Sequence, residues 1–153
     1  MINNDVLRSL RFMLDISDAQ VAEISGLAGL ETRAGHIGAC LKKEDEPGFT
    51  PCTDELLAHF LDGLVIFRRG RDDSRQPPPI ELPLSNNTVL KKLRVAFELK
   101  EDDLHAILQA ADFPVSKPEL SALFRKAGHS NYRDCGDQLL RNFLKGLTLR
   151  LRG

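Results

Sequence analysis

The chain has 153 residues, of which 42% are hydrophobic, and a formal net charge of −1. This length suits one ordinary domain or two very small ones, and the near-neutral charge argues against a protein that binds polyanions over its whole surface. No apolar run approaches the roughly 18 to 20 residues that span a bilayer, and the first residues lack the apolar segment of a signal peptide, so we expect a cytoplasmic protein without a membrane segment.

Asn3 or Asn4 is predicted to be the N-cap of the first helix, because an asparagine amide oxygen can accept a hydrogen bond from an unpaired N–H of the first turn. Helical spacing places its apolar residues in one stripe: Val6, Leu7, Leu10, Met13 and Leu14. A second helix follows Ser17, where the residues S-D-A-Q have the form of a capping box.

Two more helices complete the first half of the chain. The third is predicted over residues 32–43 and the fourth over residues 52–69, with Leu56, Leu57, Phe60, Leu61, Leu64 and Phe67 on one face. The fourth helix ends on two arginines followed by Gly70, which suits the negative end of the helix dipole and a glycine stop.

Residues 84–153 then repeat residues 1–70 at an offset of 83, without a gap. The repeat predicts an N-cap at Asn86 or Asn87, and Ser116 opens a further capping box with Leu120, Leu123 and Phe124 turned inward. Identical pairs run along the whole alignment, among them Asn3/Asn86, Asn4/Asn87, Arg11/Arg94, Cys52/Cys135, Asp54/Asp137, Phe60/Phe143 and Gly63/Gly146.

The predicted fold is therefore all-α, with two homologous four-helix modules and no strand. The first repeat is residues 1–70 and the second is residues 84–153. The Pro-rich linker between them, residues 71–83, carries three consecutive prolines and is expected to be extended.

These repeated segments resemble the YehS-like family of bacterial proteins, whose function is unknown. The resemblance rests on NNDVLRSLR, LKKEDEPGF, FLDGL, NNTVLKKLRVAFELKEDD and HSNYRDCGDQLLRNFLKGL, and it covers essentially the whole chain. It implies a bacterial cytosolic protein built from two such repeats. It implies no activity, cofactor or substrate.

Asn4 and Arg11 lie on the same edge of the first helix, and Asn87 and Arg94 repeat this arrangement. Two interpretations follow. Each arginine pairs with the aspartate of its own repeat, Asp54 or Asp137, and so fixes the orientation of two helices. Alternatively, the asparagine and arginine bind a phosphate or carboxylate at the start of the helix.

Basic residues gather in the second repeat. Residues 1–83 carry a net charge of −5 and residues 84–153 a net charge of +4. Such residues commonly compensate helix dipoles, but a strip of them is also typical of a nucleic-acid interface. The strip would comprise Lys91, Lys92, Arg94, Arg125 and Lys126, with Lys42 and Lys43 in the first repeat, where the acidic residues 44–46 dilute the charge.

Gly63 and Gly146 interrupt the last helix of each repeat at matching places. Glycine destabilises a helix interior by about 1 kcal/mol relative to alanine, so a repeated glycine indicates that another helix backbone passes close by. The residues from Gln20 to Leu27 resemble the first helix of a helix-turn-helix, but the turn that follows is longer than that motif allows.

No catalytic motif is present, the four histidines show no metal-binding spacing, and the three cysteines form no C-x-x-C pair. We therefore expect a non-enzymatic protein-interaction module, a monomer or weak homodimer, with an unidentified protein partner and no cofactor or metal. The alternative is a nucleic-acid-binding regulatory protein that uses the second repeat, through Asn87, Lys91, Lys92, Arg94, Arg125 and Lys126.

Overall fold

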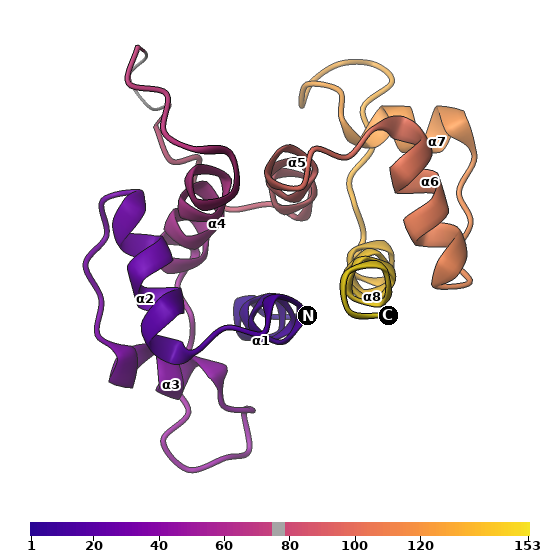
Figure 1. Cartoon of the computed structure of the whole chain (residues 1–153). Coiled ribbons are helices and arrows are strands. Elements are labelled where there is room, and N and C mark those ends of the chain that lie inside the picture. Colours follow the sequence, from indigo (N-terminus) through magenta and orange to yellow (C-terminus); the bar gives the residue numbers. More distant parts are fainter. Residues whose placement is uncertain (75–78) are drawn as a thin grey trace. The chain divides into compact units, whose positions relative to one another are not determined.

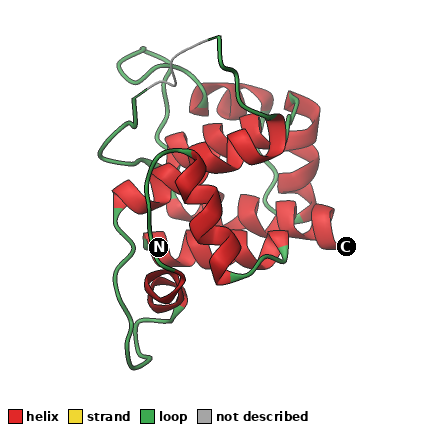
Figure 2. Ribbon diagram, turned by 60° about the vertical axis from the view of Figure 1, so that its left-hand side comes forward, coloured by secondary structure: helices red, strands yellow, loops and turns green. Residues whose placement is uncertain are grey.

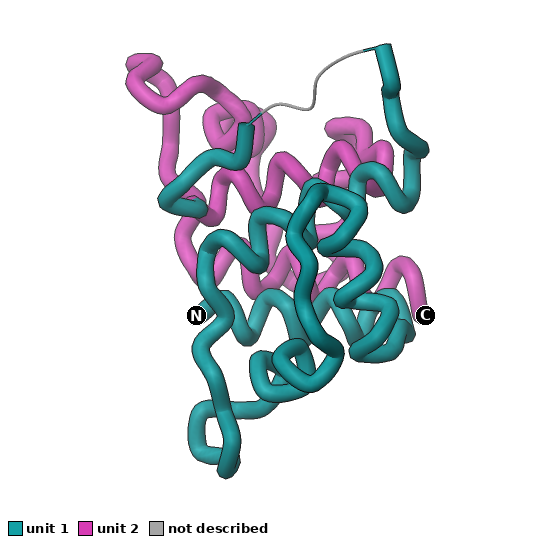
Figure 3. Tube along the Cα trace, turned by 90° about the vertical axis from the view of Figure 1, so that its left-hand side faces the viewer, with its two compact units in different colours: residues 1–84 teal, residues 85–153 magenta. Residues whose placement is uncertain are grey.

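The computed structural model describes residues 1–74 and 79–153. Within these residues the chain forms eight α-helices and no strand (Figure 1 and Figure 2). It divides into two compact units, Met1–Leu84 and Ser85–Gly153, each with four helices (Figure 3). The predicted all-α class with two four-helix modules is confirmed. None of the described helices combines the length and apolar character needed to cross a membrane.

The linker prediction falls partly on residues 75–78, which include Pro77 and Pro78 and lie outside the described residues. On either side of them the chain is bonded to the first unit. Arg71 donates from Nη2 to the carbonyl oxygen of Leu27 at 2.7 Å, and the N–H of Leu84 donates to Asp54 Oδ2 at 3.0 Å. These bonds account for a first unit that extends beyond its last helix.

The first unit contains α1 (Asn3–Leu14), α2 (Asp18–Leu27), α3 (Ala34–Leu41) and α4 (Asp54–Arg69). The capping box predicted at Ser17 is confirmed: its Oγ accepts from the N–H of Gln20 at 3.2 Å, and Gln20 Oε1 accepts from the N–H of Ser17 at 2.9 Å. Each bond gives a partner to an N–H that the helix itself leaves unpaired.

The second unit contains α5 (Asn86–Ala96), α6 (Glu101–Ala110), α7 (Lys117–Leu123) and α8 (Asp137–Arg152). The capping box at Ser116 is also confirmed, because its Oγ accepts from the N–H of Glu119 at 3.2 Å and the Glu119 carboxylate accepts in return. Leu120 and Leu123 are buried as predicted. Phe124 lies just past the end of α7 and is only half-buried.

The predictions of asparagine N-caps are wrong. Ile2 occupies the cap of α1 and Ser85 the cap of α5, where Ser85 Oγ accepts from the N–H of Thr88 at 3.1 Å. The asparagine side chains bond to distant segments instead. For the same reason α4 begins at Asp54 rather than at residue 52: the N–H of Cys52 donates to Asn4 Oδ1.

Each unit buries its core along its longest helix. Most of the apolar face of α4 and of α8 is buried, and α4 packs mainly on α2 whereas α8 packs mainly on α6. Near the ends of these helices Phe67, Leu149 and Leu151 are exposed, so the predicted buried face of the fourth helix does not extend to Phe67. Burial of these side chains is the main favourable term in folding. The matching core residues of the two helices are Leu57, Phe60, Leu61 and Leu64 in α4 and Leu140, Phe143, Leu144 and Leu147 in α8.

Close approach of two helix backbones explains the repeated glycines, as predicted. A Cβ atom on Gly63 would lie 1.8 Å from the carbonyl oxygen of Ile24 in α2. A Cβ atom on Gly146 would lie 2.1 Å from the carbonyl oxygen of Ile107 in α6. Because the clashing atom is backbone in both units, the neighbouring helix would have to move as a whole to admit any side chain.

Gly63→Ala and Gly146→Ala are therefore expected to destabilise their own units by about 3 kcal/mol, which is the cost of overpacking without room to relax. Urea unfolding followed by circular dichroism would measure the change. Gly35→Ala is the matched control, because nothing lies within 4 Å of a Cβ at this position of α3. It should stabilise the protein by up to about 1 kcal/mol. Equal effects of the three substitutions would contradict the backbone crossing.

Candidate functional site

The side-chain carboxamide of Asn4 makes three hydrogen bonds inside the first unit. Its Nδ2 donates to the carbonyl oxygens of Cys40 and Thr50, both at 2.8 Å, and its Oδ1 accepts from the N–H of Cys52 at 2.9 Å. The side chain is buried, with 2% of the residue exposed. One carboxamide thus joins α1 to the end of α3 and to the segment before α4.

Asn87 repeats this arrangement in the second unit. Its Nδ2 donates to the carbonyl oxygens of Leu123 at 3.0 Å and Arg133 at 2.9 Å, and its Oδ1 accepts from the N–H of Cys135 at 2.8 Å. These partners occupy the positions that match Cys40, Thr50 and Cys52. We call each set of three bonds an asparagine staple. A carboxamide occupied in this way is not available to a phosphate or carboxylate ligand.

Asp54 and Asp137 bond to the neighbouring asparagines. Asn3 Nδ2 donates to Asp54 Oδ1 at 2.7 Å, and Asn86 Nδ2 donates to Asp137 Oδ1 at 2.8 Å. The second of these bonds holds the pKa of the Asp137 carboxyl below its usual value. The two aspartates are thus joined to the first helix of their own unit, as predicted, but by an amide rather than an arginine.

The predicted Arg11–Asp54 and Arg94–Asp137 ion pairs are wrong. Arg11 lies in the last turn of α1, and its Nε is 3.2 Å from Asp18 Oδ1. Both of these side chains are largely exposed, at 45% and 39%, and exposed pairs contribute at most about 1 kcal/mol. Arg94 donates from Nε to the carbonyl oxygen of Leu99 at 3.1 Å and lies over the ring of Phe124, 4.7 Å from its centroid.

We expect Asn4→Ala to lower the free energy of unfolding by about 3 kcal/mol, because it leaves two carbonyl groups and one N–H without their partner. Asn87→Ala should do the same to the second unit. Arg11→Ala, which removes only an exposed ion pair, should change stability by less than about 1 kcal/mol. Urea titration of the three variants tests this order. A larger loss for Arg11→Ala than for Asn4→Ala would refute the assignment of the asparagine as the structural residue.

Three side chains of the predicted basic strip remain available to contact an anionic partner. The side chains of Lys91, Arg125 and Lys126 are exposed and make no hydrogen bond or ion pair in the described part of the chain. Lys92 is half-buried and has an interaction of its own. Asn87 is used in the staple and Arg94 in its contacts with Leu99 and Phe124, so the strip is smaller than the sequence predicted.

In the first unit the matching cations bind backbone carbonyls. Arg8 matches Lys91, and its Nη1 donates to the carbonyl oxygens of Leu41 at 3.4 Å and Lys42 at 3.3 Å, where α3 ends. Lys42 matches Arg125 and donates from Nζ to the carbonyl oxygen of Pro47 at 2.9 Å. Arg8 therefore compensates the carbonyl end of α3, whereas Lys42 binds a carbonyl of the loop that follows that helix.

The thiols are buried and protonated. Burial raises the pKa of Cys52 to about 12 and that of Cys135 to about 11, and it also raises the pKa of Cys40. While it is buried and protonated, a thiol reacts only slowly with electrophiles and oxidants at neutral pH and is a poor metal ligand. Among the described residues, no group of three or more His, Cys, Asp and Glu is placed to hold a metal ion.

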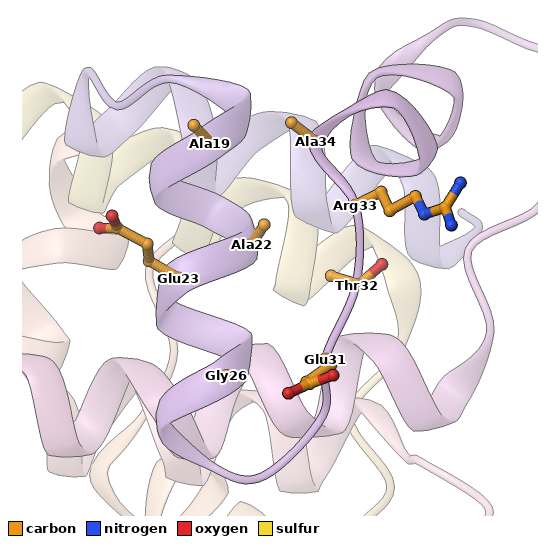
Figure 4. Close-up of a pocket in the computed structure, with 8 residues that line it drawn as sticks. All are labelled: Ala19, Ala22, Glu23, Gly26, Glu31, Thr32, Arg33 and Ala34. Carbon is orange, nitrogen blue, oxygen red and sulfur yellow. The ribbon is translucent and has the colours of Figure 1, made fainter.

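A groove lies on the first unit between α2 and the segment 31–34, and sequence reasoning did not find it (Figure 4). Its volume is about 590 Å³. Four small residues line it, Ala19, Ala22 and Gly26 from α2 and Ala34 from the start of α3. The remaining lining residues are Glu23 of α2 and Glu31, Thr32 and Arg33 of the segment before α3. In Figure 4, Ala22 faces the 31–34 segment, whereas the Arg33 side chain points away from α2.

The second repeat does not carry this small-residue surface. The residues that match Ala19, Ala22, Gly26 and Ala34 are Asp102, His105, Gln109 and Lys117, all of which project well beyond Cβ. Such a difference between copies of one fold is visible in the sequence and is the signal that would have located the groove. We refer to this surface, the eight residues around α2, as the alanine groove.

The two repeats are found again in comparisons with known proteins. A family described as "Protein of unknown function (DUF1456)" matches residues 3–70 and again residues 86–153. The chain belongs to this family. Each match coincides with one of the four-helix units and contains one complete asparagine staple.

The chain is also 47% identical over 150 residues to "Uncharacterized protein YehS" of Escherichia coli (strain K12). The alignment covers 98% of this chain and 96% of that protein. The resemblance seen in the sequence is thereby confirmed. No solved structure matches the chain. The family is uncharacterised, and its name assigns no activity.

Proposed function

We propose that this protein is a non-enzymatic binding module and that the alanine groove of the first unit is its docking site for another protein. The observation that carries the proposal is the groove itself, about 590 Å³ beside a helix whose facing residues are alanine and glycine. A partner segment can approach such a surface to within backbone contact. Protein-binding grooves commonly receive a helix or an extended strand in this way.

The charges around the groove favour a basic partner. The carboxylates of Glu23 and Glu31 form no ion pair or hydrogen bond with residues in the ranges 1–74 and 79–153. The one cation of the lining, Arg33, is directed away from α2 (Figure 4). A segment with a ridge of small apolar side chains and flanking lysines or arginines would match both the shape and the charge.

The titratable groups of the described residues support a binding role over a catalytic one. Where a carboxyl pKa is lowered, the first cause is a local hydrogen bond: Asp103 accepts from the N–H of Lys100, and Glu119 accepts from Arg133. Where a thiol pKa is raised, burial is the first cause. The pKa values of catalytic acids and bases are usually shifted toward neutrality by groups that converge in a cleft. The pKa shifts of these carboxyls and thiols have other causes.

Filling the groove should abolish binding without disturbing the fold. The double substitution Ala22→His and Gly26→Gln introduces the side chains that the second repeat carries at the same positions. With the partner captured by a photo-crosslinker placed at Ala19, we expect this variant to lose at least about tenfold in affinity, which corresponds to about 1.4 kcal/mol. Gln109→Ala, on the matching surface of the second unit, is the control and should bind normally.

Removing the negative charges of the groove tests the same site independently of its shape. Glu23→Gln with Glu31→Gln should weaken binding of the captured partner several-fold at low salt and much less at high salt, because salt screens exposed charges. Isothermal titration at two salt concentrations measures this. If the groove-filling and control variants bind equally well, the docking site lies elsewhere.

The alternative is a nucleic-acid-binding role, supported by the exposed and unpaired Lys91, Arg125 and Lys126. We expect labelled DNA and RNA to bind only weakly at about 50 mM salt, because few phosphate contacts are available to release counterions. Fluorescence anisotropy of the whole chain tests this. Tight, salt-sensitive binding that is lost when these three residues are changed to alanine would establish the alternative and displace the protein-binding proposal.

A further inference from the structure

Two thiols of the first unit lie side by side. Cys40 is on α3 and Cys52 precedes α4, yet their backbones are bonded to the same carboxamide: Asn4 Nδ2 donates to the carbonyl oxygen of Cys40 and Asn4 Oδ1 accepts from the N–H of Cys52. Cys40 Sγ is 4.0 Å from the carbonyl oxygen of Pro51, the residue next to Cys52. After burial, the neighbouring Cys40 thiol is the next cause of the raised pKa of Cys52, which fits two thiols that lie close together.

We propose that Cys40 and Cys52 are a modification site at which a hydroperoxide forms an intramolecular disulfide. The oxidant first converts the Cys40 thiol to a sulfenic acid and is itself reduced to water or an alcohol. The Cys52 sulfur then attacks the Cys40 sulfur, an S–S bond forms, and the sulfenic hydroxyl leaves as a second water with the Cys52 proton. Overall, two thiols lose two electrons and two protons.

The position of Cys40 makes it the first sulfur to react. Its Sγ lies 3.7 Å from Nε2 of His36, an exposed residue one helical turn away that can accept the thiol proton and connects the sulfur to solvent. Cys52 has no such neighbour; its Sγ is 3.7 Å from the carbonyl oxygen of Thr53 and lies near the Asp54 carboxylate. Cys52 is therefore suited to be the second, resolving sulfur.

Access for the oxidant depends on the short helix α3. It spans eight residues, Ala34–Leu41, and contains two glycines, Gly35 and Gly38. Short helices with glycines open locally more readily than long packed ones, and each opening exposes Cys40. Because both thiols are buried in the closed state, the reaction is expected to be slow and limited by this opening.

The second unit provides an internal control. Cys135 matches Cys52 and donates its N–H to Asn87 in the same staple, but Leu123 stands where the first unit has Cys40. Cys135 thus shares the burial and local geometry of Cys52 without a partner thiol. Only the first unit can form the disulfide, so Cys135 should keep its thiol under the same treatment.

Treatment of the whole chain with hydrogen peroxide, followed by denaturing alkylation and peptide mass spectrometry, tests the proposal. We expect a disulfide between the peptides that contain Cys40 and Cys52, an alkylated Cys135, and a higher melting temperature because the cross-link closes a loop. Cys40→Leu, which installs the residue of the second unit, should fold normally and leave Cys52 alkylated. The proposal is overturned if both thiols remain alkylated, if either is driven to sulfinic acid without a disulfide, or if Cys135 reacts as fast as the pair.

Discussion

A carboxamide in each repeat, buried in the first and half-buried in the second, supplies partners for backbone groups that no helix can pair. The end of α3, the loop after it and the segment before α4 all meet Asn4, and the corresponding parts of the second unit meet Asn87. A buried N–H or C=O without a partner costs about 1–3 kcal/mol, so three bonds to one residue are a large term beside the few kcal/mol by which a small domain is stable. The position of α4, and with it the core, depends on these bonds.

The duplication kept the interior and changed the surface. Both units retain the staple, the Asn3–Asp54 and Asn86–Asp137 bonds, and a glycine where two helix backbones cross. The staple and the glycine leave little room for another residue, because both are set by backbone atoms a few ångströms away. Along the exposed side of α2 and α6 nothing imposes such a constraint, and there the copies differ: the first has the alanine groove and the second has longer polar side chains.

Much of this fold could be predicted because it depends on patterns of residues that are close together in the sequence. Helical periodicity, the capping boxes at Ser17 and Ser116, and the repeated Gly63 and Gly146 each depend on residues close in sequence or on a comparison of the two copies. The roles of Asn4 and Arg11 could not be predicted in this way. The partners of Asn4 lie 36 to 48 residues away, and a local pattern cannot separate a helix cap from a tertiary hydrogen bond. The alanine groove was missed because small residues on an exposed helix face look unremarkable without the second copy beside them.

Every bond of a staple stays within its own repeat. The partners of Asn4 lie between residues 40 and 52, and those of Asn87 between residues 123 and 135. The order in which the repeats follow each other along the polypeptide is therefore not fixed by these bonds. A circularly permuted gene that encoded the second repeat before the first would preserve each of them, and the same holds for a chain made of two identical repeats.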